Sequence, residues 1–455
     1  MNNIVRIGNA QGFWGDSPGA AARLAQQQPD LDYLTLDYLA ELSLSIMAIQ
    51  REKDPSMGYA RDFVEVVRSL TPLWKKGSQL KIVTNAGGLN PLACAQACQR
   101  LLQQERLPQI RIGVVSGDDL LSLMKTNPQN HSFENLETHE SLIAIQEKLV
   151  TANAYLGAKP IVQALSMGAH IVITGRTADP SLTVAPCAAH FNWSLDDDYD
   201  RLAGATIAGH LIECGTQVTG GISTDWLQMP DPAHLGFPIV EVDANGDCVI
   251  TKPLNTGGKV TINTVKEQLL YEVGDPDHYL SPDATVSFLS LTLKEVGENR
   301  IHISGAKGNP PPPSYKVSAT YRDGFKAEAY LAIFGVDAQT KARRCGEIIL
   351  QRVREAGYDL QRTIIECLGA GAIAPGVVSS APSMECVLRI AAADSRQEAL
   401  DCFAKEIAPM VTSGPQGVSG YSSGRPHIRP VFGYWPCLVA RDQISPIVQI
   451  LEASR

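Results

Sequence analysis

The side chains best suited to chemistry gather in a few short loops of the sequence. In "TGRTADPS", Arg176 offers a planar guanidinium that can hold a carboxylate, Thr177 adds a hydroxyl, and Asp179 can accept a proton. Asp179 also stands before a proline, which is a common helix start, so its carboxylate can serve simply as a helix cap. Arg176 can equally be an ordinary ion-pair partner. The loop therefore indicates an anion-binding site with a base beside it, or a capped helix.

A second candidate region is "LIECGTQVTGGISTDW", which spans residues 211 to 226 and is dense in small and polar residues. Such a density is expected of residues that line a binding site, and equally of a tightly turned segment that crosses the core. Cys214 has only His210 near it in the sequence, and a buried, inert thiol is the commoner state of cysteine. Glu213 is therefore preferred over Cys214 as the second acid–base group, with Thr219 and Gly220 as candidate substrate-binding residues.

Three short apolar runs lead into polar loops that end in a capping residue followed by proline. The capping residues are Ser17, Asn90 and Asp179. Capping alone explains any one loop, but three together favour a shared ligand site, because ligands bind at the carboxyl ends of parallel strands. We predict that each capping residue begins a helix whose N-terminus faces one pocket. The substrate-binding candidates in the first two loops are Gly12, Asp16, Ser17, Asn85, Gly87, Gly88 and Asn90.

The glycines of these loops do not follow the patterns that bind nucleotides. Neither "GNAQGFWG" nor "NAGGLNP" matches GxGxxG or GxxxxGK[ST]. The expected ligand is therefore a carboxylate or the phosphates of a coenzyme. No cofactor is predicted, and CoA is expected only as part of the substrate. The 10 cysteines and 9 histidines show no metal-ligand spacing, so no metal site is predicted.

The first half of the chain alternates β-rich runs with helical segments. Such alternation predicts parallel strands joined by crossover helices, and a doubly wound, mostly parallel sheet is expected, with an α/β barrel as the alternative. The expected strands are Ile4 to Ile7, Asp32 to Leu36, Leu80 to Thr84, Ile110 to Val115 and His170 to Thr174.

From about Leu235 the pattern changes to hairpins, with turns expected at Asn245-Gly246 and Asp323-Gly324. This predicts a C-terminal α+β region rich in antiparallel hairpins, forming a layer distinct from the parallel sheet. The domains are expected at 1–234, which would bind the ligand, and 235–455. The later elements are expected to be helices at Ala338 to Ala356 and Arg396 to Ile407, and strands at Arg362 to Leu368 and Met384 to Ala391.

Composition excludes some functional classes. The chain has 455 residues, 44% of them hydrophobic, and carries 39 basic against 48 acidic residues. No basic patch is present to attract a phosphate backbone, so nucleic acid is not an expected partner. No apolar stretch is long enough to span a membrane, and no secretory leader is recognised, so we expect a cytoplasmic protein without a membrane partner.

Several of the same motifs carry a family resemblance. "GFWGDSPGA", "TNAGGLNP", "VITGRTADPS" and "ECGTQVTGG" resemble the acyclic terpene utilisation (AtuA) family, and the resemblance covers most of the chain. It implies a relation to proteins encoded with enzymes that degrade citronellol and geraniol through CoA thioesters. Longer members carry a further C-terminal ferredoxin-like domain, whereas this chain ends soon after "SGYSSGRPHIRPVFGYWPCLVARDQI". The resemblance therefore implies a separate small subunit of ferredoxin-like fold as a partner.

Two functional classes follow from these observations. The first is a lyase, such as a hydratase or dehydratase, acting on a small carboxylate or an acyl-CoA. In it, Arg176 and the loops hold the anion, and Asp179 or Glu213 moves the proton. The second is a non-catalytic metabolite-binding or scaffold subunit of a catabolic complex. A homo-oligomer is expected in either case.

Overall fold

The computed structural model describes residues 3–40, 42–377, 383–420 and 424–452. The chain forms two compact units. Unit 1 comprises residues 1–320 and 434–455, and unit 2 comprises residues 321–433. The units thus divide after residue 320, while residue 235, where the sequence indicates a boundary, lies within unit 1.

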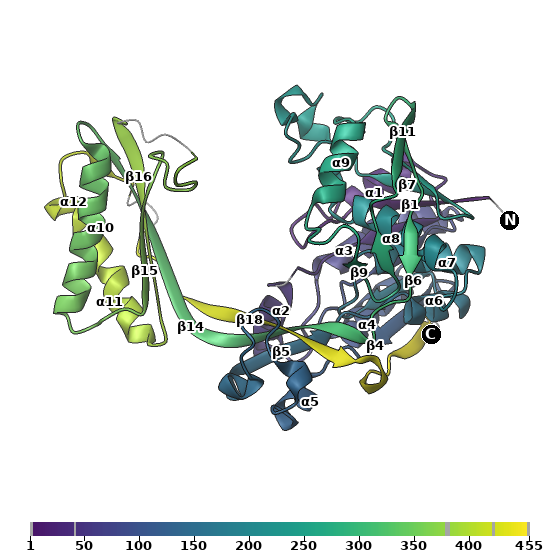
Figure 1. Ribbon diagram of the computed structural model, residues 1–455, viewed down its shortest axis with the longest axis horizontal. Coiled ribbons are helices and arrows are strands. Elements are labelled where there is room, and N and C mark those ends of the chain that lie inside the picture. The colour runs from purple at the N-terminus through teal and green to yellow at the C-terminus, as the bar shows by residue number, and fades with distance from the viewer. Residues whose placement is uncertain (1–2, 41, 378–382, 421–423, 453–455) are drawn as a thin grey trace. The chain divides into compact units, whose positions relative to one another are not determined.

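Unit 1 is built on a ten-stranded sheet with five parallel strands at its centre (Figure 1). Across the sheet these are β1 (Ile4–Asn9), β2 (Tyr33–Leu36), β3 (Lys81–Thr84), β6 (Ile171–Thr174) and β4 (Arg111–Ser116). Every residue of β2 and β6 is buried, as expected for central parallel strands covered on both faces. The predicted α/β class is therefore confirmed, and all five expected strands form.

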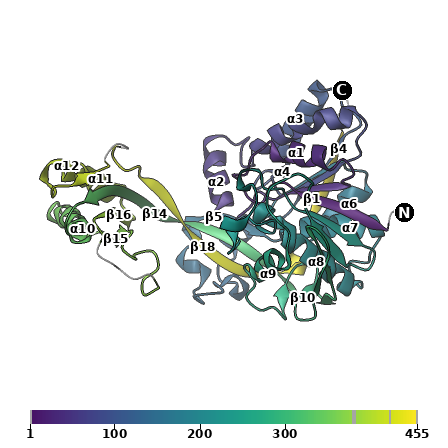
Figure 2. The same ribbon diagram turned by 90° about the horizontal axis from the view of Figure 1, so that it is seen from above.

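Two rows of helices cover this sheet (Figure 2). One row contains α1 (Ala20–Gln27), α3 (Asp62–Lys75) and α4 (Pro91–Gln104), and the other contains α6 (Lys159–Ser166), α7 (Ser181–Phe191) and α8 (Tyr199–Glu213). Strands β4 and β6 contact both α4 and α6, one helix from each row. Helices therefore pack on both faces of the parallel strands, which is the arrangement of a doubly wound sheet.

Antiparallel strands extend the sheet at both edges. Beyond β1 lie β7 (Ile239–Asp243), β8 (Cys248–Thr251), β12 (Arg300–Ser304) and β11 (Thr292–Gly297), and beyond β4 lies β19 (Ile447–Glu452). The predicted Asn245-Gly246 hairpin joins β7 to β8, with Gly246 at φ +90°. However, β7 pairs directly with β1, so the prediction of a separate antiparallel layer is wrong for β7, β8, β12 and β11, and a separate antiparallel sheet forms only later in the chain, in unit 2. The sequence indicates local hairpins but not which distant strand accepts them.

The second predicted hairpin does not form. Asp323 and Gly324 lie inside one long strand, β14 (Ser314–Phe334). Gly324 has φ +81°, and a Cβ there would lie 2.6 Å from the carbonyl oxygen of Asp394 on the neighbouring strand. The glycine thus permits an irregular backbone and a close approach to the neighbouring strand. An Asp-Gly pair at such a position cannot be distinguished, by sequence alone, from the Asp-Gly pair of a hairpin turn.

Unit 2 contains the second part of β14, followed by α10 (Ala338–Glu355), β15 (Arg362–Leu368), β16 (Glu385–Asp394), α11 (Gln397–Ile407), α12 (Met410–Ser413) and β17 (Val418–Ser419). Its strands lie in the order β15-β16-β14-β17, and all the pairings are antiparallel. Helices α10 and α11 pack against each other and against this sheet. This is the split βαβ topology of ferredoxin-like folds, present within this chain itself.

The remaining strands and α-helices lie in unit 1, except that β18 begins in unit 2. Strand β5 (Leu149–Ala154) pairs with β14, as does β18 (Arg429–Ala440), and a small antiparallel sheet has the order β13-β10-β9. No helix among the described residues is long and apolar enough to cross a membrane. The other bounds are β9 (Tyr279–Leu280), β10 (Thr285–Ser287), β13 (Lys307–Asn309), α2 (Ser43–Lys53), α5 (Leu121–Thr126) and α9 (Ile262–Leu270).

Candidate functional site

A cavity of about 770 Å³ in unit 1 opens beside the carboxyl ends of β1, β2 and β6. Another of about 700 Å³ adjoins the amino ends of β2 and β3, but ligands of open α/β sheets bind at the carboxyl ends. We therefore take the first as the candidate site. Its polar lining residues are Asp16, Asp37, Tyr155, Arg176, Asp179, Glu213, Cys214, Thr216, Gln217, Tyr271, Glu272, Lys316 and Tyr434.

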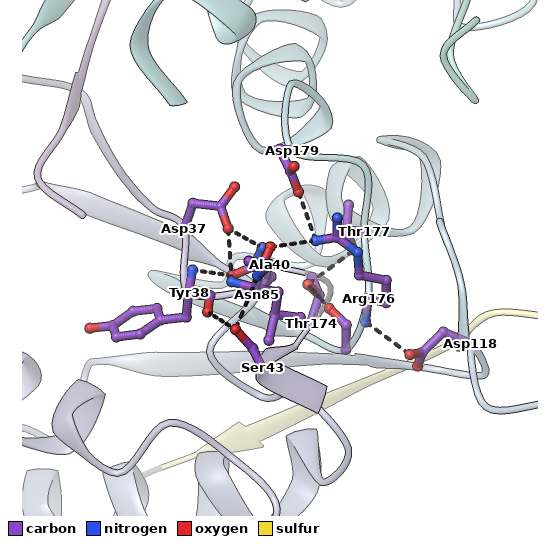
Figure 3. Close-up of polar contacts among 12 residues, drawn as sticks. Asp37, Tyr38, Ala40, Ser43, Asn85, Asp118, Thr174, Arg176, Thr177 and Asp179 are labelled. Carbon is purple, nitrogen blue, oxygen red and sulfur yellow. Dashed lines mark hydrogen bonds and ion pairs between the residues drawn. The ribbon is translucent and has the colours of Figure 1, made fainter. Parts of the chain in front are cut away.

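Arg176 is the buried cation of this cavity, and its side chain is only 5% exposed. Its Nη1 donates to the carbonyl oxygen of Leu39 at 3.0 Å and to Oδ1 of Asp179 at 2.8 Å (Figure 3). The guanidinium carbon lies 4.0 Å from the ring centroid of Tyr155, a cation–π distance. Burial alone would lower the pKa of Arg176, but Asp179, Tyr155 and Asp37 raise it, so the cation is held charged.

Asp37, which no local sequence pattern indicated, follows β2 and lies beside Arg176 (Figure 3). Its Oδ1 accepts hydrogen bonds from the backbone N–H of Leu39 at 3.0 Å and from Nδ2 of Asn85 at 2.7 Å. Burial raises the pKa of Asp37 well above its usual value, and the charge of Asp179 adds to this rise. Asp37 is therefore suited to hold a proton. Its place at the end of a buried strand was the signal that could have identified it.

Glu213 lines the same cavity from the last residue of α8. Its Oε1 lies 2.9 Å from Nδ1 of His210, one helical turn earlier. Burial raises the pKa of Glu213, the hydrogen bond from His210 lowers it, and the charge of Asp179 raises it again. Glu213 and Asp37 are thus two cavity carboxyls whose pKa values lie above the usual range, a property common at sites of proton transfer.

The loop after β1 contributes Gly12 and Asp16. The backbone N–H of Gly12 donates to Oδ2 of Asp16 at 2.8 Å, and burial raises the pKa of Asp16. Ser17 is exposed and does not cap a helix, because α1 begins only at Ala20 and its N-cap residue is Gly19. The prediction for Ser17 is therefore wrong: two further turn residues separate the serine from the helix.

The two other predicted caps differ from each other. Asn90 caps α4 as expected, since its Oδ1 accepts from the N–H of Ala93 at 3.3 Å, but Asn90 is not among the described lining residues of the cavity. Asp179 lines the cavity but is not the cap, because α7 begins at Ser181 after Pro180. The Asp179 carboxylate instead accepts a hydrogen bond from the guanidinium of Arg176 at 2.8 Å. The three predicted helix starts therefore do not share one pocket.

Several other predicted binding residues do not line the cavity; some form hydrogen bonds next to it and others lie elsewhere. Asn85 orients Asp37 and accepts from the N–H of Tyr38, and Oγ1 of Thr177 donates to Oγ1 of Thr174 at 3.0 Å. Oγ1 of Thr219 donates to the carbonyl oxygen of Gly236 at 2.7 Å. The predicted residues that do not appear among the described lining residues are Ser17, Asn85, Gly87, Gly88, Asn90, Thr177, Thr219 and Gly220.

Lining residues from distant segments could not be found by local patterns. Tyr155 follows β5, Lys316 lies on β14, and Tyr434 lies on β18. Burial raises the pKa of the Cys214 thiol, in keeping with an inert cysteine. Within the described residues, no group of three or more His, Cys, Asp and Glu side chains is arranged to hold a metal ion.

Together, the fold and this cavity define a mixed α/β protein with buried carboxyl groups and an arginine at the carboxyl ends of its parallel strands. The sequence matches the model of the family described as acyclic terpene utilisation family protein AtuA over residues 5–450, so the chain belongs to this family, as the resemblance of its motifs predicted. No curated protein and no solved structure matches the chain significantly.

Proposed function

We propose that this member of the family is a lyase-type enzyme, a hydratase or dehydratase, that acts on a small carboxylate or an acyl-CoA. The observation that carries the proposal is the pairing of cavity carboxyls of raised pKa, Asp37 and Glu213, with the buried Arg176. A carboxyl group whose pKa lies closer to neutrality can donate or accept a proton efficiently in that pH range.

Such a reaction divides the work among the cavity residues. In a dehydration, one carboxylate removes a proton from carbon while a carboxylic acid protonates the departing hydroxyl; hydration reverses both transfers. Glu213 and Asp179 are the groups proposed to move the proton at carbon. Asp37, whose burial favours its neutral form, is suited to donate to oxygen.

The charges of the cavity favour a defined orientation of the substrate. Among the described residues, five carboxyl groups line it, from Asp16, Asp37, Asp179, Glu213 and Glu272, against two cations, Arg176 and Lys316. An anionic substrate group is repelled by ionised carboxylates and attracted by the cations. We therefore place the substrate carboxylate or the acyl-CoA phosphates toward Lys316 and Arg176, and the reacting carbon toward Glu213.

One observation favours the alternative of a non-catalytic metabolite-binding or scaffold subunit. The Arg176 guanidinium donates hydrogen bonds to the carbonyl oxygen of Leu39 and to Asp179, so the arginine already has an internal structural role. A scaffold would retain such a cavity for binding alone.

A thermal-shift screen tests the proposal, using hydroxy acids, unsaturated di- and tricarboxylates and CoA thioesters as probes. A ligand at a hundred times its Kd adds about 2.7 kcal/mol of stability, which is readily detected. Each stabilising compound is then incubated with the wild type, Glu213→Gln and Asp179→Asn, and water addition or loss is followed by NMR. Turnover that the substitutions abolish supports a lyase. Binding without turnover supports the scaffold, and no binding by any probe class contradicts both.

A further inference from the structure

The His210 side chain is buried and contacts a residue of the candidate site. The proposed reaction gives it no role so far. It lies one turn before Glu213 on α8, and its side chain is 2% exposed, against 13% for Glu213. Its Nδ1 is 2.9 Å from Oε1 of Glu213. This is hydrogen-bonding distance, so the two side chains form a pair in which only Glu213 lines the cavity.

Two polar atoms of this pair have no hydrogen-bond partner among the described residues: Nε2 of His210 and Oε2 of Glu213. Leaving a buried polar atom unpaired costs about 1–3 kcal/mol, so its presence calls for a reason. Oε2 of Glu213 is closed to solvent, so a group bound in the cavity reaches it only if the carboxyl group turns. His210 packs against the rings of Tyr279 and Phe288, each with its centroid 5.9 Å from that of the imidazole.

We propose that His210 is a positioning residue for Glu213: the hydrogen on Nδ1 holds Oε1 and so fixes the carboxyl group in place where Glu213 lines the cavity. This inference rests on the proposed function. An ionised Glu213 can only accept, so the imidazole then donates from Nδ1 to Oε1, either as the neutral Nδ1–H tautomer or as the imidazolium. In a dehydration, the Glu213 carboxylate takes the proton from the substrate carbon, the C–H electron pair forms the double bond, and the hydroxyl leaves as water with a proton from Asp37. In a hydration, water adds, Asp37 regains its proton and Glu213 returns the other proton to carbon.

The groups around the pair shift the pKa of Glu213 in opposite directions. Burial raises the pKa of Glu213, His210 lowers it, and the charges of Asp179 and Glu272 raise it. For His210 itself, burial lowers the pKa, while Glu213 and Glu272 raise it. Tyr279, which packs on the imidazole, has a pKa raised well above its usual value by burial and so remains a neutral phenol. Removal of the His210 donor therefore shifts the titration of Glu213 to higher pH.

Two amide variants separate the roles of the two ring nitrogens. In His210→Asn the amide nitrogen falls near the position of Nδ1, whereas in His210→Gln it falls near the position of Nε2. The protonation of Glu213 is measured by infrared spectroscopy on full-length protein labelled with ¹³C-glutamate, without substrate. The band of Glu213 is identified by its loss in Glu213→Gln. Circular dichroism checks that each variant is folded, and His210→Phe replaces His210→Gln if the latter does not fold.

We expect the titration of Glu213 to stay near that of the wild type in His210→Asn and to move to higher pH in His210→Gln or His210→Phe. An equal shift in the variants with and without the donor near Nδ1, or no shift in either, would overturn the proposal. The readout needs no substrate, so it is independent of the ligand screen. A split between the variants together with a failed screen would leave His210 as the residue that holds Glu213 and would reject the lyase.

Discussion

At the scale of single residues, Arg176 combines two roles that the sequence presents as alternatives. It lines the cavity and also joins the segments after β2 and β6 through Leu39 and Asp179. Its backbone N–H donates to Oδ2 of Asp118 at 2.8 Å as well. From sequence alone, a ligand-anchoring arginine implies little effect of substitution on melting temperature. Its burial changes that expectation.

We expect Arg176→Lys to lower both the stability and the affinity for ligand. Lysine keeps the charge but loses the planar contact with Tyr155 and the fixed geometry toward Leu39 and Asp179. Loss of a charged hydrogen bond costs about 1.5–3 kcal/mol. Thermal melting measures the effect, with Lys316→Gln as the control, because Lys316 is exposed and lines the same cavity. Equal melting temperatures for wild type and Arg176→Lys would show that Arg176 has no structural role.

A second residue-scale prediction concerns Asp118, a buried carboxyl behind Arg176. Burial raises its pKa from 3.8 to about 6, although the N–H of Arg176 and the amide of Asn153 lower it. Between these two pH values the folded protein binds more protons than the unfolded chain. Stability from this group is therefore fully present below pH 3.8 and is lost as the pH rises to about 6. The shift corresponds to about 3 kcal/mol, at about 1.36 kcal/mol per pH unit.

Asp118→Asn should remove this pH dependence while retaining an oxygen for both donors. We expect the wild type to lose stability relative to Asp118→Asn from pH 4 to 6, with a constant difference above that. Urea unfolding followed by tryptophan fluorescence measures it, because all 5 tryptophans lie in unit 1. A difference between the two proteins that does not change over this range would contradict a raised pKa.

The site residues that sequence could indicate were those next to strand ends or in dense polar loops. Gly12, Asp16, Arg176, Asp179 and Glu213 all reach the cavity. Three others lie on or next to strands whose place depends on long-range pairing rather than on local pattern: Tyr155 follows β5, Lys316 lies on β14 and Tyr434 lies on β18.

At the scale of elements, strand and helix positions were predictable because each depends on a local apolar pattern. The expected strand Arg362 to Leu368 is β15, and the expected helix Ala338 to Ala356 is α10. Helix caps were less predictable, since a carboxylate near a helix start also responds to tertiary partners. Asp179 binds Arg176 instead of capping α7.

The loop between β1 and α1 supplies an element-scale prediction. A Cβ on Gly12 would lie 2.7 Å from the carbonyl carbon of Cys214 and 2.8 Å from the amide nitrogen of Gly215. Both are backbone atoms, so the loop or the end of α8 must move. We expect Gly12→Ala to destabilise unit 1 by about 1–3 kcal/mol and to weaken ligand binding. Thermal melting and the ligand screen measure the two effects.

Gly274→Ala is the matched control for this substitution. No atom of the described residues lies within 4 Å of a Cβ at Gly274, and no positive φ is required there. We expect it to leave melting and binding near the wild-type values. If Gly12→Ala behaved like Gly274→Ala, the close contact between Gly12 and the end of α8 would not hold in solution.

At the scale of the whole molecule, each unit has a hydrophobic core of its own. The core of unit 1 includes buried side chains of β2, α3 and α4, and the core of unit 2 lies between its antiparallel sheet and helices α10 and α11. The cavity is lined by described residues of unit 1 alone. A domain boundary was hard to place from sequence. The strands within residues 239–304 have the sequence pattern of local hairpins, yet β7 pairs with β1, and β8 and β12 follow it in the same sheet.

Separate cores imply that damage to one unit should remain largely local. Leu388 on β16 is fully buried in unit 2, and Leu388→Ala should destabilise that unit by about 2–5 kcal/mol through the lost contacts and the cavity left behind. Ile364→Ala on β15 is the control, because Ile364 is 42% exposed and its truncation should cost much less. Hydrogen exchange measured by mass spectrometry should rise across residues 321–433 in Leu388→Ala and stay unchanged around Arg176. An equal rise in both units would mean that the chain unfolds as one cooperative structure despite its two cores.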